Sequence, residues 1–236
     1  MTSGSVQLHA IRPTESSDIS VLSPIERKRA DSFRFREDAL RWISYRTAMR
    51  SILGERLGIS PVDVPIRISE RGKPYLEGPR ESLHFNLSHS NCLAILAIST
   101  AGPVGVDLEP MDRAADLLEC ESSFCHPLEI AGLPDDPAVR QDLLLQLWTM
   151  KEAVLKAVGT GFLLPPESIR IETDFGSMHR AISAESQDLF VPQKIQRIDH
   201  PSLVGYRVAV SSLQQTWYLI DSGASTGTTD PIRVRP

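Results

Sequence analysis

The order of predicted elements along this chain repeats after about 100 residues, and this repeat limits the possible folds more than any other feature. In each copy, alternating apolar residues indicate a strand, a helical spacing of apolar residues follows, and a second strand comes after it. The corresponding segments are residues 6–11 and 104–109, 37–57 and 143–158, and 64–68 and 169–171. We therefore predict an α+β fold of two similar α/β halves, joined near Gly102, with a cleft between them.

The repeat also predicts the domain boundaries. Residues 1–102 form the N-terminal half, and residues 103–221 form the C-terminal half. Residues 222–236 begin with a low-complexity stretch of Ser, Gly and Thr, so we expect a flexible tail there.

Composition narrows the setting in which the chain works. The longest clean apolar run has six residues, far fewer than the ~20 that a membrane-spanning helix needs. The first residues lack the basic and apolar regions of a secretory signal. Three cysteines are too few, and odd in number, for a disulfide framework. We therefore expect a cytoplasmic protein with no membrane partner.

Charge is distributed unevenly behind a net charge of −5. Residues 27–50 hold eight basic and three acidic side chains, whereas residues 104–165 hold eleven acidic and four basic ones. This arrangement suits an anionic ligand that is bound partly by cations and partly through a metal ion. A solvated helix face would also account for the basic segment. The pI of about 5.7 and the lack of interleaved aromatic residues argue against nucleic acid as a partner.

The strand predicted at residues 104–109 carries two carboxylates on one face. Side chains alternate along a strand, so Asp107 and Glu109 point to the side opposite Val104, Val106 and Leu108. Two carboxylates at a strand end are half of a site for a hard cation such as Mg²⁺. An acidic strand edge that faces water would show the same pattern.

The helix predicted at residues 143–158 carries a third carboxylate. Trp148, Glu152 and Lys156 are spaced four residues apart and share one face. They predict a metal carboxylate with an ammonium group one turn away, although a helix-stabilising Glu–Lys pair has the same spacing. Lys151 lies off this face, and we expect it at the surface or in a secondary contact.

Two polar segments are further candidates for a ligand site, and several known motifs are missing. His89 is predicted in a turn, residues 88–91, between strands at 84–87 and 92–99; a second turn is predicted at Arg71–Pro74. Each would be a plain exposed turn if taken alone. Cys120, Cys125 and His126 lack further ligands for zinc. No dinucleotide-binding or Walker glycine pattern is present.

Four motifs, in their order along the chain, resemble those of the 4′-phosphopantetheinyl transferases of the Sfp type, in the branch with Trp and Lys-Glu-Ala. The motifs are Gly72–Pro74, Phe85–Ser90, Gly105–Glu109 and Trp148–Lys156. The resemblance covers roughly residues 20 to 210 and implies a monomeric intramolecular pseudo-dimer of two α/β halves. It also implies the transfer of 4′-phosphopantetheine from coenzyme A to a serine of an acyl or peptidyl carrier protein, with release of 3′,5′-ADP.

The resemblance also implies roles for individual residues. Asp107, Glu109 and Glu152 match the ligands of Mg²⁺, which Mn²⁺ could replace, and Glu152 would serve as general base. Lys156 matches the lysine at the diphosphate, where it would balance charge on the leaving oxygen. The residues that match coenzyme A contacts are Lys73, Pro74, Ser88 and His89.

Some positions stay open within this resemblance. Arg27, Lys28 and Arg29 are all candidates for the 3′-phosphate, and Arg50 fits a helix arginine for which Arg46 competes. Phe124 and Glu129 lie one residue further apart than the family pattern, which leaves open what that segment contributes to carrier binding. The rival interpretations are another Mg²⁺-dependent phosphotransferase or diphosphate hydrolase, and an inactive relative that binds coenzyme A or a carrier.

Overall fold

The computed structural model describes residues 5–78, 83–160, 163–174, 178–183, 193–213, 216–221 and 232–234. Its α-helices are α1 (Pro24–Asp31), α2 (Arg36–Leu57), α3 (Pro127–Ile130) and α4 (Pro137–Val158). Its strands are β1 (Ser5–Ile11), β2 (Ile66–Ile68), β3 (Pro74–Leu76), β4 (His84–Ser90), β5 (Leu93–Ser99), β6 (Val104–Pro110), β7 (Ile169–Asp174), β8 (Met178–Ser183), β9 (Gln193–Arg197), β10 (Tyr206–Ser212), β11 (Thr216–Asp221) and β12 (Ile232–Val234).

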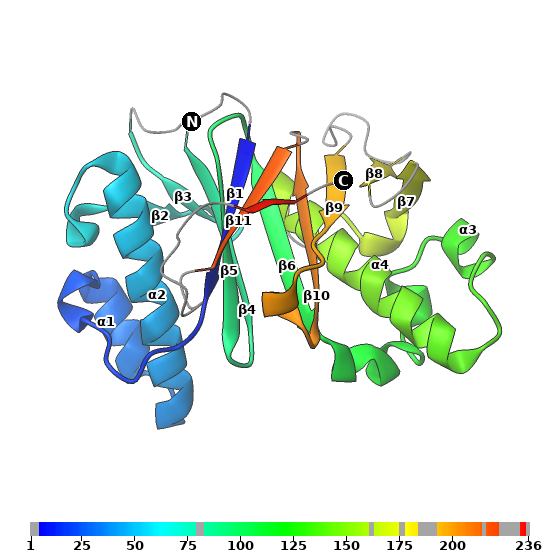
Figure 1. Ribbon diagram of the computed structural model, residues 1–236, viewed down its shortest axis with the longest axis horizontal. Helices are drawn as coiled ribbons and strands as arrows, with labels where there is room; N and C mark the ends of the chain where they lie inside the picture. Colours follow the sequence, from blue (N-terminus) through cyan, green and yellow to red (C-terminus); the bar gives the residue numbers. More distant parts are fainter. Residues whose placement is uncertain are drawn as a thin grey trace.

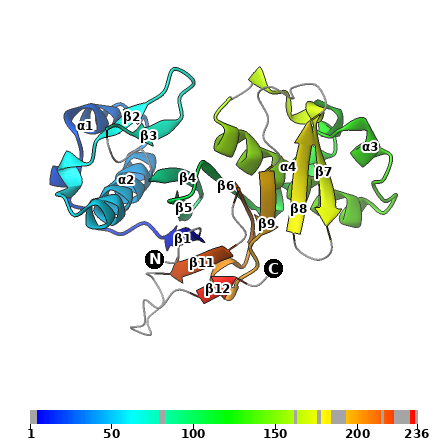
Figure 2. The same ribbon diagram turned by 90° about the horizontal axis from the view of Figure 1, so that it is seen from above.

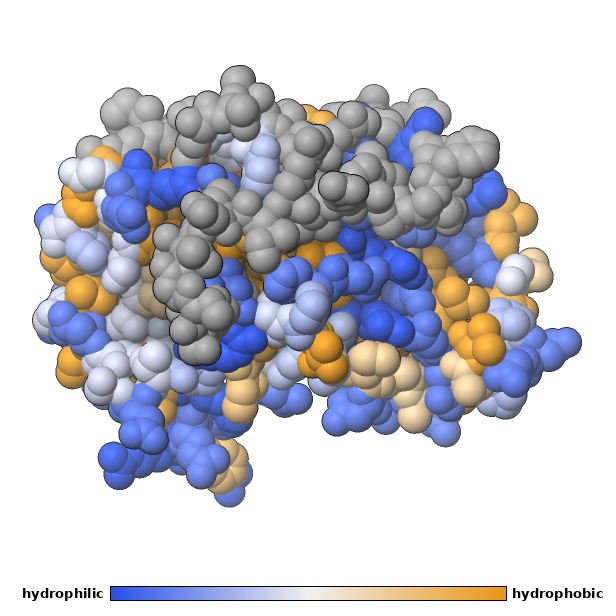
Figure 3. Space-filling model, in the orientation of Figure 1, coloured by the Kyte–Doolittle hydropathy of each residue, from blue (hydrophilic) through white to orange (hydrophobic). Residues whose placement is uncertain are grey.

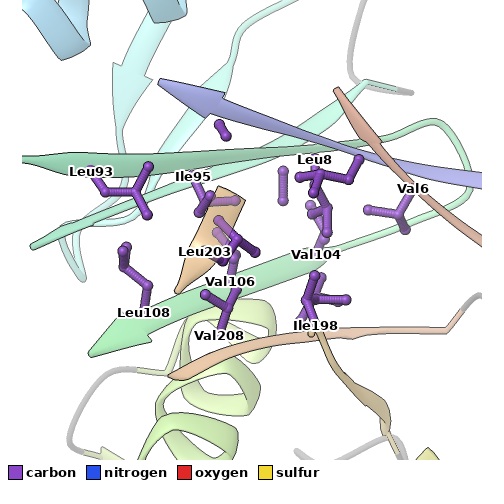
Figure 4. Close-up of a cluster of buried hydrophobic side chains, with 14 residues drawn as sticks. Val6, Leu8, Leu93, Ile95, Val104, Val106, Leu108, Ile198, Leu203 and Val208 are labelled. Atoms are coloured by element: carbon purple, nitrogen blue, oxygen red, sulfur yellow. The ribbon is translucent and has the colours of Figure 1, made fainter. Parts of the chain in front are cut away.

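Two five-stranded sheets form the centre of the molecule (Figure 1). The first has the order β12-β11-β1-β5-β4, and the second has the order β6-β10-β9-β8-β7. Their facing sides share one apolar core, to which Leu8 and Ile95 contribute from the first sheet and Val106 and Val208 from the second (Figure 4). Burial of this core holds the two sheets together.

One long helix covers the outer face of each sheet. Tyr45, Met49 and Leu53 of α2 pack on the first sheet, while Val154 and neighbouring residues of α4 pack on the second. Seen from above, α2 and α4 therefore lie on opposite sides of the strands (Figure 2). In the space-filling view, the lower edge of the outline is notched between the half with α1 and α2 and the half with α4 (Figure 3).

The layers agree with local sequence signals. Both α2 and α4 have 22 residues, and they end at Gly58 and Gly159, whose φ angles of 65° and 74° favour glycine. Strand β5 is buried on both faces, as a continuous apolar run predicts. The predicted α+β fold of two halves, each with a helix on a sheet, is confirmed. The detailed pseudo-dimer relation between the halves stays a prediction.

The end of the chain returns to the first sheet. Strand β11 pairs with β1 in parallel, and β12 pairs with β11. Sheet membership therefore crosses the boundary predicted at residues 102 and 103, and residues 232–234 of the predicted tail form a strand. Strand β11 covers the edge of β1, which would otherwise expose its backbone hydrogen-bonding groups. The low-complexity stretch 222–229 lies outside the described residues.

Two further observations concern the cysteines and the helices. All three cysteines are free: Cys92 is exposed, Cys120 is half-buried and Cys125 is buried. In the described part of the chain, α-helices long and apolar enough to pass through a bilayer are absent.

Candidate active site

Strand β6 and helix α4 approach each other closely because residue 105 is glycine. A Cβ atom at Gly105 would lie 2.0 Å from the Ala153 carbonyl oxygen and 2.3 Å from the Ala157 nitrogen. Only a residue without a side chain fits there. The close packing brings the next residues on the same face of β6 beside the helix, so that Asp107 Oδ1 lies 2.6 Å from Lys156 Nζ.

The predicted alternation along β6 is confirmed on its apolar face. Val104, Val106 and Leu108 are fully buried in the core between the sheets. Gly105 and Asp107, on the other face, contact α4 or its side chains. The Asp-x-Glu pair is therefore not an acidic strand edge in water.

Asp107 is the most buried of the three predicted carboxylates, with 3 % of its surface exposed. Its Oδ1 accepts hydrogen bonds from Ser88 Oγ (2.9 Å) and from Lys156 Nζ. Its Oδ2 is buried and has no partner among the described residues. A buried carboxylate oxygen without a donor is a suitable ligand for a hard cation.

Glu109 is held by two side chains at one oxygen. Its Oε1 accepts hydrogen bonds from Trp148 Nε1 (3.0 Å) and from Arg113 Nη1 (2.5 Å). Arg113 follows Glu109 by one turn, in the short 3₁₀ helix η3 (Met111–Leu117). Arg113 is a site residue that was not predicted from the sequence, although its spacing of four residues from Glu109 is the spacing of neighbours on a helical turn.

Glu152 faces the other two carboxylates from α4. Burial raises the pKa of Glu152; Lys156 opposes this shift, while the charges of Asp107 and Glu109 add to it. Its carboxylate has no hydrogen bond or ion pair with any residue that the structure describes. Asp107 and Glu109 are therefore near enough to Glu152 to raise its pKa, which is consistent with the predicted convergence of the three carboxylates.

The three carboxylates do not form a finished metal site. Among the described residues, no three His, Cys, Asp or Glu side chains are arranged as a metal-binding group. Instead, Lys156 and Arg113 neutralise Asp107 and Glu109. The set nevertheless fits a hard divalent cation, because it offers three carboxylates, one with a buried and unpartnered oxygen.

A cavity of about 280 Å³ is lined by Glu152, by its neighbour Lys156 and by the Gly-Lys-Pro segment. Its lining residues are Arg71, Gly72, Lys73, Pro74, Asn86, Glu152, Leu155, Lys156 and Gly159. Lys73 Nζ donates to the Ala157 carbonyl oxygen at 2.8 Å, and burial lowers the pKa of Lys73 to about 8. The structure thus brings Lys73 and Pro74 together with Glu152 and Lys156.

The segment around His89 is a strand rather than the predicted turn. Strand β4 continues to Ser90, and the chain reverses at Asn91, where φ is 49°. Because side chains alternate along β4, Ser88 points to Asp107, whereas the His89 ring stacks on Tyr45 with 5.6 Å between centroids. Partial desolvation, Lys156 and Arg46 together lower the pKa of His89.

His89 lines a second cavity, of about 380 Å³, on the α2 side of β4. Its lining residues are Arg29, Phe33, Asp38, Arg41, Trp42, Tyr45, His89 and Asn91. Arg27, Lys28 and Arg29 are all exposed on α1, and of these three Arg29 lines the cavity. Arg41 is a further cation that sequence reasoning missed, because the basic run alone does not show which arginines face a ligand.

Arg50 does not reach either cavity, which corrects the expectation that it contacts coenzyme A. Its side chain is 3 % exposed, and its Nε lies 2.5 Å from Glu26 Oε2. Its Nη1 donates to backbone carbonyl oxygens of residues 61, 62 and 64. Arg46 also pairs with Glu26, at 3.3 Å, but it is near enough to lower the pKa of His89. Arg46 does not line either cavity, so neither arginine is placed at a ligand by the cavities.

Lys151 is fully buried, so of its two expected positions the one at the surface is wrong. Its Nζ lies 2.7 Å from Glu129 Oε2 and donates to three backbone carbonyl oxygens, including that of Phe124. The Phe124 ring packs edge-on against Trp148, with 5.3 Å between centroids. The segment with the unusual Phe–Glu spacing therefore contacts α4 through both Phe124 and Glu129.

Comparisons with known proteins agree with this arrangement. The model of the 4′-phosphopantetheinyl transferase superfamily matches residues 103–208, and the model of the 4′-phosphopantetheinyl transferase N-terminal region matches residues 11–101. The 4′-phosphopantetheinyl transferase HetI of a Nostoc species is 37 % identical over 71 % of this chain and 73 % of its own length. The 4′-phosphopantetheinyl transferase Sfp of Bacillus subtilis is 29 % identical over 81 % of this chain and 82 % of its own length.

The chain therefore belongs to the 4′-phosphopantetheinyl transferase superfamily, as a member of the Sfp type. It is an enzyme of the class that transfers phosphopantetheine to carrier proteins.

Proposed function

We propose that this enzyme transfers 4′-phosphopantetheine from coenzyme A to a serine of an acyl or peptidyl carrier protein, with Mg²⁺ or Mn²⁺, and releases 3′,5′-ADP. The observation that carries the proposal is the cavity in which Glu152 and Lys156 meet the Gly-Lys-Pro segment, with Asp107 and Glu109 adjoining it. A phosphotransfer site needs such a combination of carboxylates and cations around one space.

The two cavities support binding of an anionic, partly aromatic substrate. Arg29, Arg41 and His89 offer positive charge or hydrogen-bond donors in the second cavity, and Trp42 and Tyr45 offer ring faces. This set suits the 3′-phosphoadenosine end of coenzyme A. Lys73 and Lys156 in the first cavity suit the diphosphate.

Asp107, Glu109 and Glu152 would hold the divalent ion. When bound, such an ion neutralises phosphate charge that would repel an oxygen nucleophile. Its ligands come from both a strand and a helix, and the unpartnered Oδ2 of Asp107 supports this assignment.

Two side chains supply the proton and charge chemistry. The raised pKa of Glu152 brings this carboxylate closer to the range in which it can accept the proton of the attacking serine hydroxyl. The Lys156 ammonium, one turn further along α4, balances negative charge that develops on the leaving bridging oxygen. For this, Lys156 must exchange its present ion pair with Asp107 for the substrate.

Coenzyme A and a panel of apo carrier proteins, read by intact mass, test this function. We expect one phosphopantetheine to be added per carrier in the presence of Mg²⁺. We expect Asp107→Ala and Glu152→Gln to reduce transfer by about 10³-fold or more, because each removes a carboxylate that would hold the charge-neutralising divalent ion. Cleavage of coenzyme A without any carrier mass shift would instead indicate a diphosphate hydrolase, and binding without product would indicate an inactive relative.

We also propose that the enzyme acts as a monomer, because one chain contains both cavities and all three carboxylates. Light scattering behind a sizing column should give a mass near 26.1 kDa. A dimeric mass at assay concentration would contradict this.

A further inference from the structure

Two cations pair with two of the three carboxylates in the candidate active site. Lys156 pairs with Asp107 at 2.6 Å, and Arg113 pairs with Glu109 at 2.5 Å. Glu152 has no hydrogen bond or ion pair with any of the described residues. The function proposed above gives Lys156 a task at the substrate, but it gives Arg113 none.

Arg113 is held in place from two directions. Its guanidinium donates to Glu109 Oε1 and lies over the Trp148 ring, 5.7 Å from the centroid. The Arg113 side chain is 42 % exposed, so water screens part of its attraction to Glu109.

We propose that Arg113 is a counter-ion of Glu109, a positioning residue that competes with the divalent ion for this carboxylate and thereby sets the concentration at which the ion binds. The inference rests on the metal assignment in the proposed function. Its physical reason is simple: three carboxylates in one place repel each other, and Arg113 relieves this repulsion until a divalent cation does.

Trp148 provides an internal comparison because it binds the same oxygen without carrying charge. Its Nε1 donates to Glu109 Oε1 at 3.0 Å. A donor of this kind orients a metal ligand and does not compete with the ion. Removing the indole N–H should therefore weaken metal binding, whereas removing the guanidinium charge should strengthen it. The two contacts to one atom predict effects of opposite sign.

Binding of Mn²⁺ alone, measured from the electron paramagnetic resonance signal of the free ion, tests this without any turnover. Arg113→Gln should bind Mn²⁺ about three- to tenfold more tightly than the native protein, from loss of one partly screened positive charge. Trp148→Phe keeps a ring against Phe124 and should bind about tenfold more weakly. Arg140→Gln is the matched control, because Arg140 donates to Glu121 through two hydrogen bonds and is no partner of the three carboxylates.

A second measurement guards against misfolded variants. In the presence of EDTA, Arg113→Gln should unfold at a lower temperature than the native protein. Mn²⁺ should then raise the unfolding temperature of Arg113→Gln by more than it raises that of the native protein. Equal Mn²⁺ affinity in the native, Arg113→Gln and Arg140→Gln proteins, or weaker binding by Arg113→Gln, would overturn the counter-ion role alone. Absence of Mn²⁺ binding from all of these proteins would overturn the metal assignment of the proposed function as well.

Discussion

Lys151 and Lys156 lie five residues apart on α4, but their surroundings separate their roles. Lys151 is fully buried, and its ammonium has a carboxylate and three carbonyl partners. Lys156 is partly exposed at the cavity and has Asp107 and Ser88 as partners. A buried lysine with all its donors used stabilises the local structure, whereas a half-exposed one can exchange partners with a substrate.

Lys73 should give the enzyme a pH dependence on the alkaline side. Burial lowers its pKa to about 8, so this ammonium is charged below pH 8 and becomes neutral above it. If the charge binds the diphosphate, kcat/KM for coenzyme A should fall as the pH rises through about 8, by up to about tenfold per pH unit. A pH series of initial rates at low coenzyme A concentration measures this.

Lys73→Arg is the control, because a guanidinium stays charged over that range. We expect this variant to lose the fall near pH 8. The same fall in Lys73→Arg would show that another group is responsible.

The contact between β6 and α4 decides whether the carboxylates meet. Both elements could be predicted separately, but their separation is set by Gly105, whose Cβ position is occupied by the backbone of residues 153 and 157. The same contact places the Asp107 side chain beside Lys156. A single residue without a side chain thus couples the packing of two elements to the geometry of the site.

Gly105→Ala should therefore reduce both stability and activity. The added methyl group would force β6 and α4 apart, at a cost of about 3 kcal/mol in the free energy of unfolding, measured by urea titration. Gly132→Ala is the matched control, since its Cβ would lie 3.5 Å from the nearest atom and should change stability by less than about 0.5 kcal/mol. Equal effects of the two substitutions would contradict this account.

At the scale of the molecule, the end of the chain completes the half in which the chain begins. Strand β11 lies beside β1, and Leu219 fills the core between the sheets. Arg12 and Asp221 form an ion pair at 2.8 Å across the same two segments. The N-terminal sheet therefore includes strands from both predicted halves, and we expect that the two halves do not fold as independent consecutive units.

Two truncations should separate the contributions of β11 and β12. A chain that ends at Leu213 loses Leu219 from the core and exposes the edge of β1, so we expect no cooperative thermal unfolding. A chain that ends at Asp221 keeps β11 and the ion pair with Arg12, and its unfolding temperature should fall by only about 2–4 °C. A cooperative transition at the native temperature in the shorter chain would refute this.

Local sequence signals were sufficient for much of the architecture. The spacing of apolar residues predicted α2 and α4, since each helix buries one side on a sheet and ends at a glycine with positive φ. Alternation along β6 predicted which carboxylates share a face. The motifs led to the correct family, because its chemistry needs particular residue types at particular spacings.

Local sequence signals did not predict the contacts between distant segments. No pattern near Lys151 shows that Glu129 will bury its charge, and none near Arg50 shows that Glu26 will use its guanidinium. The return of β11 to β1, across more than 200 residues, is equally invisible locally. Periodicity reports which side of an element is apolar, but which element covers that side, and which charges meet there, depends on packing of the whole chain.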